Sequence, residues 1–121
     1  DQVEVSKTDA YKLGINPPVR KSGHLDGASA VEIIGPVGKV TLNCAIIANR
    51  HIHISDADAK KLNVNDDDAV GIIINGEKQG IIEGFFKTSK DGYFELHLDT
   101  DDANSFLLKQ NDEVEIKLKK L

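Results

Sequence analysis

One arrangement of apolar and polar residues recurs three times along the chain. Each copy begins with an apolar–polar–apolar triplet, continues with Ser or Asp, and carries an Asp three residues later. The triplet has the two-residue period of a half-buried strand. The Ser/Asp–Asp pair is close to a helix capping box in which Asp replaces Glu or Gln. The pattern therefore predicts a strand followed by about two turns of capped helix. The copies occupy residues 3–15, 52–64 and 96–108.

The ends of the copies also carry recognisable signals, because Gly and Asn are typical of helix C-termini. The expected helix ends are Gly14, Asn63 and Lys109–Gln110. The second and third copies then continue alike as residues 65–72 and 111–116. Each continuation predicts a polar turn followed by another strand.

The segments between the copies are typical of hairpins. Strand-like runs at residues 31–34 and 39–42 flank a Gly-Pro-Val-Gly turn. Turn signals also stand at residues 75–76 (Asn-Gly) and 90–92 (Lys-Asp-Gly). Residues 16–27 show neither period and predict a long loop. Many short strands with short capped helices predict a mainly β fold made of small closed β-barrels.

Composition excludes several classes of protein. The chain has 121 residues, with 15 Lys+Arg against 20 Asp+Glu and a net charge of −5. This balance argues against nucleic acid as the main partner, and the basic cluster Lys117, Lys119 and Lys120 is interpreted as a solvated tail. No apolar run approaches the ~20 residues of a membrane-spanning helix. The single cysteine, Cys44, predicts a core residue in a reducing compartment. Because the chain contains no Met, Asp1 is not expected to be the first residue of the gene product.

The repeat aligns three residues that can bind a metal. Glu4, His53 and His97 occupy the same position, the polar residue of the triplet at the strand end. Alternation directs this side chain away from the apolar face, and His51 lies on the same face as His53. Three imidazoles with an open coordination position are typical of a catalytic zinc site. The alternative is that a duplicated module keeps polar residues there because the strand end is wet.

Two arginines are candidate contacts for an anion. Arg50 lies directly before the His-x-His segment, where its guanidinium could help to hold an anionic group. Arg20, in the predicted long loop, is the candidate catalytic residue because it could bind an anionic group of a substrate. A solvated loop arginine is the alternative interpretation of Arg20.

Four motifs follow one another along the chain. They are residues 18–23 (PVRKSG), 34–38 (IGPVG), 50–55 (RHIHIS) and 96–104 (LHLDTDDAN). Together they resemble the phosphate propanoyltransferase family, the phosphotransacylases associated with propanediol utilisation and bacterial microcompartments. The resemblance covers essentially the whole chain. It implies two small β-barrels, with residues 1–48 forming part of one and residues 49–121 forming most of the other.

The resemblance also implies an activity and its cofactor. Such enzymes interconvert an acyl-CoA (propanoyl-CoA or acetyl-CoA) plus phosphate with an acyl phosphate plus CoA, and they use two zinc ions. The resemblance implies that His51, His53 and His97 hold one zinc and that Glu4 is a ligand of the other. The remaining protein ligands of that second zinc and a phosphate-binding arginine belong to an upstream segment that this sequence lacks. The chain is therefore expected to be a C-terminal portion, with one barrel lacking its N-terminal strand.

Two other functions stay open at this point. One is a non-catalytic, AbrB-like barrel that acts as a binding module, and the other is a zinc-dependent thioester hydrolase. Under the main interpretation the partners are acyl-CoA or CoA and phosphate, with a homo-oligomer and a microcompartment shell as further candidates. The location would be the cytoplasm or the inside of a microcompartment. No residue is assigned to CoA, and His24 stands where the resemblance leads us to expect an acidic residue.

Overall fold

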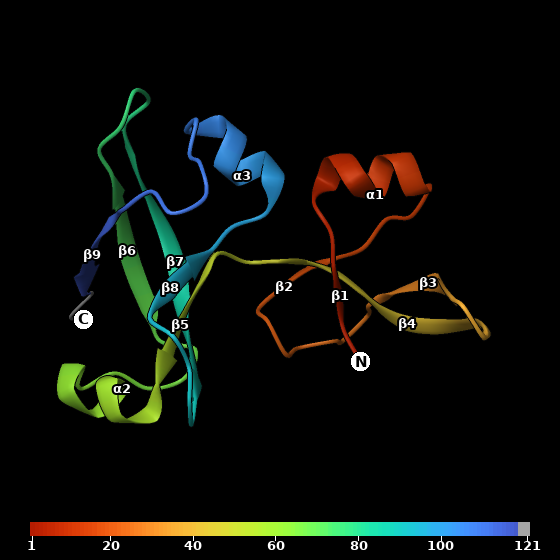
Figure 1. Ribbon diagram of the computed structural model, residues 1–121, viewed down its shortest axis with the longest axis horizontal. Coiled ribbons are helices and arrows are strands. Elements are labelled where there is room, and N and C mark those ends of the chain that lie inside the picture. Colours follow the sequence, from red (N-terminus) through yellow and green to blue (C-terminus); the bar gives the residue numbers. More distant parts are fainter. Residues whose placement is uncertain (119–121) are drawn as a thin grey trace. The chain divides into compact units, whose positions relative to one another are not determined.

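The structure is a computed structural model that describes residues 1–118. The chain divides into two compact units, Asp1–Ala48 (unit 1) and Asn49–Leu121 (unit 2) (Figure 1). In both units the strands outnumber the helices, and each helix of the described part is short. The predicted mainly β fold with short helices is therefore confirmed.

Unit 1 is built around one long strand. Its elements are β1 (Val3–Glu4), α1 (Lys7–Leu13), β2 (Val19–Arg20), β3 (Ser29–Gly35) and β4 (Gly38–Ala48). Strands β1 and β2 run parallel to β4, whereas β3 forms an antiparallel hairpin with β4 that closes at Gly35 and Gly38. The Gly-Pro-Val-Gly turn is thus confirmed. The loop predicted over residues 16–27 is interrupted by β2, because pairing with β4 makes a strand where the local sequence shows no period.

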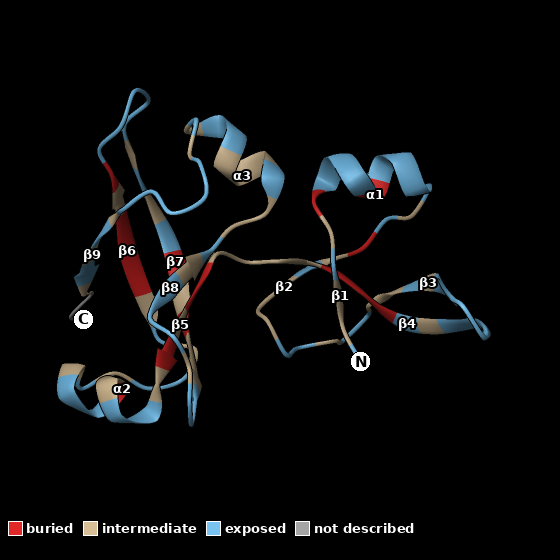
Figure 2. Ribbon diagram, viewed as in Figure 1, coloured by how far each residue is buried: buried red, intermediate tan, exposed pale blue. Residues whose placement is uncertain are grey.

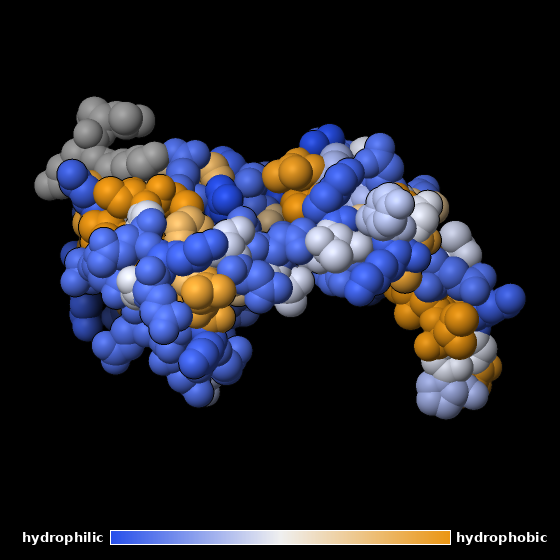
Figure 3. Space-filling view, turned by 90° about the horizontal axis from the view of Figure 1, so that it is seen from above, coloured by the Kyte–Doolittle hydropathy of each residue, from blue (hydrophilic) through white to orange (hydrophobic). Residues whose placement is uncertain are grey.

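The core of unit 1 is small. Its buried apolar residues are Ala10, Pro17, Cys44, Ala45 and Ile46, so the prediction of Cys44 as a core residue is confirmed. The β3–β4 hairpin extends beyond this core and exposes apolar side chains. Ile34 and Val37 are 73% and 99% exposed, respectively. The far end of the hairpin therefore shows apolar surface on the right of Figure 3.

Unit 2 is a five-stranded sheet with two helices. Its elements are β5 (His51–Ser55), α2 (Asp56–Leu62), β6 (Ala69–Ile74), β7 (Gly80–Ser89), β8 (Glu95–His97), α3 (Thr100–Ser105) and β9 (Glu115–Leu118). The strand order is β8-β5-β7-β6-β9, in which only β5 and β7 are parallel. The core contains the large side chains Ile52, Ile54, Ile72, Ile74 and Phe86. Figure 2 shows buried stretches in red along β5, β6 and β7.

The three capped helices confirm the repeat. In each copy the predicted Ser or Asp is the N-cap, and its side chain accepts a hydrogen bond from the backbone N–H three residues later, which satisfies a free donor of the first turn. The first two helices are followed, as predicted, by left-handed caps at Gly14 and Asn63. The prediction for the third helix is wrong: it ends at Ser105 rather than near Lys109, and Leu107 adopts a positive φ of 54°.

The polar turns after the second and third copies have the same local structure. The N–H of Asn65 donates to an Asp68 carboxylate oxygen, and the N–H of Lys109 donates in the same way to Asp112. Asp67 and Asn111 both adopt positive φ angles, of 66° and 71°. Asn111 is therefore the counterpart of Asp67, and the prediction that the two copies continue alike is confirmed. The predicted strands after both turns are confirmed as β6 and β9.

The described residues leave the predicted barrels and most of the basic C-terminal cluster untested. Among residues 1–118 no sheet closes into a barrel, so the closed barrels stay a prediction. No helix within that range is long and apolar enough to cross a membrane. The basic cluster at the C-terminus falls mostly outside the described residues, since only Lys117 belongs to β9 and Lys119 and Lys120 lie beyond it.

Candidate metal centre

The histidines of unit 2 meet because β5 and β8 are antiparallel neighbours. In the register of this pair His51 lies opposite His97, and His53 lies opposite Glu95. Residues two apart on a strand share one face, so all four side chains stand on the same side of the two strands. Ile52 alternates with the histidines and is 1% exposed on the core side. The pleat therefore separates a polar group of four residues from the apolar core.

The three imidazoles are close enough to surround one ion. One nitrogen of each of His51, His53 and His97 lies within 4.8 Å of the others. The ring centroids are 5.0 Å apart for His51–His53, 5.3 Å for His51–His97 and 4.2 Å for His53–His97. Zinc–nitrogen bonds are about 2.0–2.1 Å long, so two ligand nitrogens of one zinc lie at most about 4.2 Å apart. Small side-chain rotations would bring these nitrogens to one ion.

His51 is already oriented as a metal ligand would be. Its ring is buried, with 4% exposure, and its Nδ1 lies 2.8 Å from the backbone carbonyl oxygen of Asn49. A carbonyl oxygen only accepts, so Nδ1 carries the proton and Nε2 keeps its lone pair. This Nε2 is buried and has no hydrogen-bond partner within the described chain. An unsatisfied buried polar atom costs about 1–3 kcal/mol, and a metal bond would remove that cost.

His97 has a carboxylate partner that the sequence reasoning missed. Its Nε2 lies 2.8 Å from Oε1 of Glu95, and both side chains are about half exposed. The hydrogen bond from His97 lowers the pKa of Glu95, and the charges of His97 and His53 act in the same direction, against a smaller opposing effect of desolvation. The signal was present in the sequence as Glu-x-His on one strand, which places both side chains on one face.

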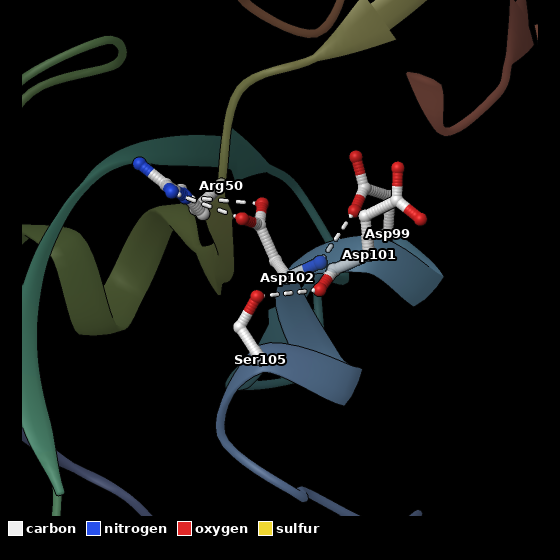
Figure 4. A network of polar contacts seen from close by, with 5 residues as sticks. All are labelled: Arg50, Asp99, Asp101, Asp102 and Ser105. Atoms are coloured by element: carbon white, nitrogen blue, oxygen red, sulfur yellow. Dashed lines mark hydrogen bonds and ion pairs between the residues drawn. The ribbon is translucent and has the colours of Figure 1, made fainter. Parts of the chain in front are cut away.

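Arg50 is engaged in an ion pair within unit 2. Its Nε and a terminal nitrogen donate to the two carboxylate oxygens of Asp102, at 3.0 and 2.9 Å (Figure 4). This bidentate pair joins the residue before β5 to the first turn of α3. Two donors of Arg50 therefore bind a carboxylate of unit 2 itself, and a contact of Arg50 with an anion stays a prediction.

The N-cap of α3 lies beside this pair. Asp99 Oδ1 accepts from the N–H of Asp102 at 2.8 Å. Burial raises the pKa of Asp99, and the negative charges of Asp102 and Asp101 raise it further, while hydrogen bonds from the backbone of both residues oppose the shift. In the third copy of the repeat, Asp99 thus caps α3 and Asp102 forms the ion pair with Arg50.

The other candidate site residues, Glu4 and Arg20, lie in unit 1 and do not belong to the histidine group. Glu4 is exposed on β1 and accepts a hydrogen bond from the Gln2 amide at 3.1 Å. Arg20 donates to two backbone carbonyls, of Asp26 and of Val19, both at 2.8 Å. The guanidinium of Arg20 therefore ties its own loop together.

The fold and the group of three histidines together define a class of protein. It is a mainly β protein with a candidate metal centre of three histidines on two paired strands. The sequence model of phosphate propanoyltransferase matches residues 1–109, which include all of these histidines. The chain belongs to the phosphate propanoyltransferase family.

Individual relatives agree with this assignment. The phosphate propanoyltransferase of Thermotoga maritima is 43% identical over 118 residues, which are 95% of this chain and 56% of that protein. The phosphate propanoyltransferase of Rhodobacter capsulatus is 40% identical over 113 residues, 92% of this chain and 52% of the relative. The one from Salmonella typhimurium is 41% identical over 107 residues, 86% and 51% respectively. The chain spans about half the length of the curated relatives it matches.

Proposed function

We propose that unit 2 supplies one zinc centre of a phosphate acyltransferase, which interconverts propanoyl-CoA or acetyl-CoA plus phosphate with the acyl phosphate plus CoA. The observation that carries this proposal is the group of three histidines, above all the buried and unpartnered Nε2 of His51. Family membership supports the reaction class. In the forward direction a phosphate oxygen forms a bond to the thioester carbonyl carbon, the carbon–sulfur bond breaks, and CoA leaves as its thiolate.

The ligands in this proposal are His51, His53 and His97. When bound, zinc would supply a Lewis acid with free coordination positions for water or a substrate oxygen. The chain's own contribution is to hold the nitrogens. His51 is fixed by burial and by the Asn49 carbonyl, and the antiparallel register sets His97 opposite it. Three protein ligands leave the centre open, as a catalytic site requires, whereas four would close it.

Two residues of unit 1, Glu4 and Arg20, are also proposed to take part in the function. Glu4 is proposed as a carboxylate ligand of the second zinc, because it occupies the repeat position of His53 and His97. Arg20 is proposed as a catalytic residue that contacts an anionic group of a substrate. Two of its nitrogens bind loop carbonyls, so that the loop would hold the guanidinium in place for an anion on the remaining donors.

The barrel architecture and the cellular location of the enzyme are also proposed. Each unit is proposed to be part of a small β-barrel, with unit 1 as part of one and unit 2 as most of the other. The enzyme is proposed to act in the cytoplasm or inside a bacterial microcompartment, as a homo-oligomer or bound to the shell.

The test is metal content in matched histidine variants. The wild-type chain is expected to bind one zinc per chain, measured by elemental analysis after dialysis against zinc. His51→Ala is expected to lose this zinc, and His24→Ala is the control because His24 lies in unit 1, outside the histidine group. Equal zinc content in all three proteins would contradict the proposal.

The reaction itself is tested with propanoyl-CoA by measuring free thiol release, with and without phosphate, in the complete enzyme. Release that requires phosphate supports acyl transfer. Release without phosphate would instead establish a thioester hydrolase. Salt-dependent DNA binding without zinc would establish the AbrB-like binding module.

A further inference from the structure

We propose that Glu95 is a positioning residue of the zinc centre, which fixes the ring of His97 so that Nδ1 is its metal-binding nitrogen. The inference rests on the proposed zinc centre. Its basis is the 2.8 Å contact between Glu95 Oε1 and His97 Nε2. An ionised carboxylate only accepts hydrogen bonds, so Nε2 carries a proton, and in the neutral imidazole that binds a metal Nδ1 keeps the lone pair.

The need for such a partner follows from where His97 lies. Strand β8 is only three residues long and forms the edge of the sheet, where β5 is its one neighbouring strand among residues 1–118. The side chain of His97 is 43% exposed, in contrast to the buried ring of His51. Packing therefore holds His51 in place, whereas His97 depends more on its hydrogen bond. A ring that rotates freely would have to lose that freedom on binding the metal.

The two histidines use the same device with different partners. His51 donates from Nδ1 to the backbone carbonyl of Asn49, and His97 donates from Nε2 to Glu95. Metal-binding histidines commonly donate their second nitrogen to a carbonyl or carboxylate, which fixes the tautomer and makes the ligand nitrogen more basic. The carboxylate adds a negative charge next to the cation, which the carbonyl on His51 does not.

The grouping of the ligand atoms favours an indirect role for Glu95. The nitrogens that lie within 4.8 Å of one another belong to His51, His53 and His97, and Glu95 is not a member of that group. The Glu95 and His97 atoms are 2.8 Å apart, which is a hydrogen-bond distance. Glu95 also lies directly opposite His53 in the strand register. Its carboxylate is thus next to the histidine group on the same face of the two strands.

The test combines zinc affinity with the tautomer of His97. Glu95→Ala is expected to weaken zinc binding by about 10–100-fold, measured by competition with a chromogenic chelator. Glu95→Gln keeps an acceptor but loses the charge, so a smaller weakening is expected. Glu77→Gln is the matched control, because Glu77 is an exposed glutamate of the same unit outside the histidine group. Its zinc affinity should equal that of the wild type.

A nitrogen-15 NMR spectrum of the metal-free protein reports which ring nitrogen of His97 carries the proton. A purely structural role of Glu95 would leave this tautomer unchanged in the variants. Wild type and Glu95→Gln are expected to show His97 protonated at Nε2, and Glu95→Ala a mixture of tautomers. The cobalt(II) absorption spectrum should keep its shape in Glu95→Ala, whereas a changed ligand set would show that Glu95 binds the metal directly and overturn the inference. Unchanged zinc affinity in Glu95→Ala, or His97 protonated at Nδ1 in the wild type, would also overturn it.

The failure of the zinc centre itself gives a different result. A wild-type chain that binds no zinc would refute the proposed function, and with it the role of Glu95 toward a metal. The tautomer of His97 in the metal-free protein is measured independently of that outcome. It would then show whether the Glu95 hydrogen bond alone orients the ring.

Discussion

The strand–cap–helix motif occurs once in unit 1 and twice in unit 2, and its neighbours differ between the units. In unit 1 the motif strand β1 lies parallel to β4, where Glu4 is in register with the apolar Ile46. In unit 2 the two motif strands pair with each other, so that His51 and His97 are directly opposite. A polar residue at the motif position therefore becomes part of a group only where a second copy lies on the adjacent strand.

The two units also differ in how they support the motif. The buried apolar residues of unit 1 are mostly small, and Ile46 is the largest of them. Unit 2 places isoleucines and Phe86 beneath the motif strands. Apolar burial contributes about 25 cal/mol per Å², so larger buried side chains provide more stabilisation. Unit 2 can therefore bear the cost of the buried, unsatisfied Nε2 of His51.

The largest predicted effect tests this support. Phe86→Ala should lower the free energy of unfolding by about 3–5 kcal/mol, because Phe86 is 1% exposed and belongs to the cluster with Ile52 and Ile54. It should also weaken zinc binding, since the cavity loosens the strand that carries His51 and His53. Urea unfolding followed by circular dichroism measures the first effect. Phe94→Ala is the control, because half-exposed Phe94 should contribute less than about 1 kcal/mol.

The next prediction tests the comparison at equivalent positions of the repeat. His97→Ala should weaken zinc binding by the chain at least about 100-fold, since loss of a direct ligand should exceed the 10–100-fold cost of losing an outer partner. Glu4→Ala should leave that affinity unchanged, because Glu4 is outside the histidine group. Isothermal titration with zinc measures both variants. Equal weakening by the two changes would show that the motif position, and not the pairing of β5 with β8, determines the site.

A third prediction compares the aspartates three residues after the caps in unit 2. Asp102→Asn should cost about 1–2 kcal/mol of stability, because it breaks a bidentate pair with the partly buried Arg50. Asp58→Asn should cost about 0.5 kcal/mol or less, since Asp58 forms only an exposed pair with Lys61 at 3.9 Å. Thermal unfolding of both variants measures the difference. A double-mutant cycle with Arg50→Ala should assign the larger cost to the pair itself.

Local patterns predicted the local structure well. The apolar–polar alternation and the caps at Ser6, Ser55 and Asp99 identified the strand–helix units. Where the outcome depended on contacts between distant segments, the sequence was insufficient. The strand β2 exists through pairing with β4, and Arg50 pairs with Asp102 because the fold brings together two residues that are 52 positions apart in the sequence. Neither contact leaves a periodic signal.

The candidate site was predictable in its residues but not in their arrangement. The repeat selected His53 and His97, and the spacing of two added His51. The register that sets His51 opposite His97 depends on which strands become neighbours, and a slip of one residue would send these side chains to the other face. The role of Glu95 was not predicted from the sequence, because it depends on the face of β8 that carries His97 and on the 2.8 Å contact between the two side chains.

The smallest predicted effect concerns the caps, where the copies differ by Ser and Asp. Asp99→Ser should change stability little in the metal-free chain, because Ser6 and Ser55 cap the equivalent helices. The substitution should instead change how the free energy of unfolding depends on pH. The pKa of Asp99 is raised in the folded protein, so the folded state binds this proton more tightly than the unfolded state. Its contribution to stability therefore falls as the pH rises from the ordinary Asp value through the raised one.

Relative to wild type, Asp99→Ser should consequently become more stable as the pH increases across that window, measured by urea unfolding at a series of pH values. Ser55→Ala is the control for loss of a cap without a titrating group: it should cost about 1 kcal/mol at every pH. A difference between wild type and Asp99→Ser that stays constant, or that changes in the opposite direction, would show that burial does not dominate at this cap. The acidic cap of the third copy would then match the serine caps of the other two in its energetics, as it does in its geometry.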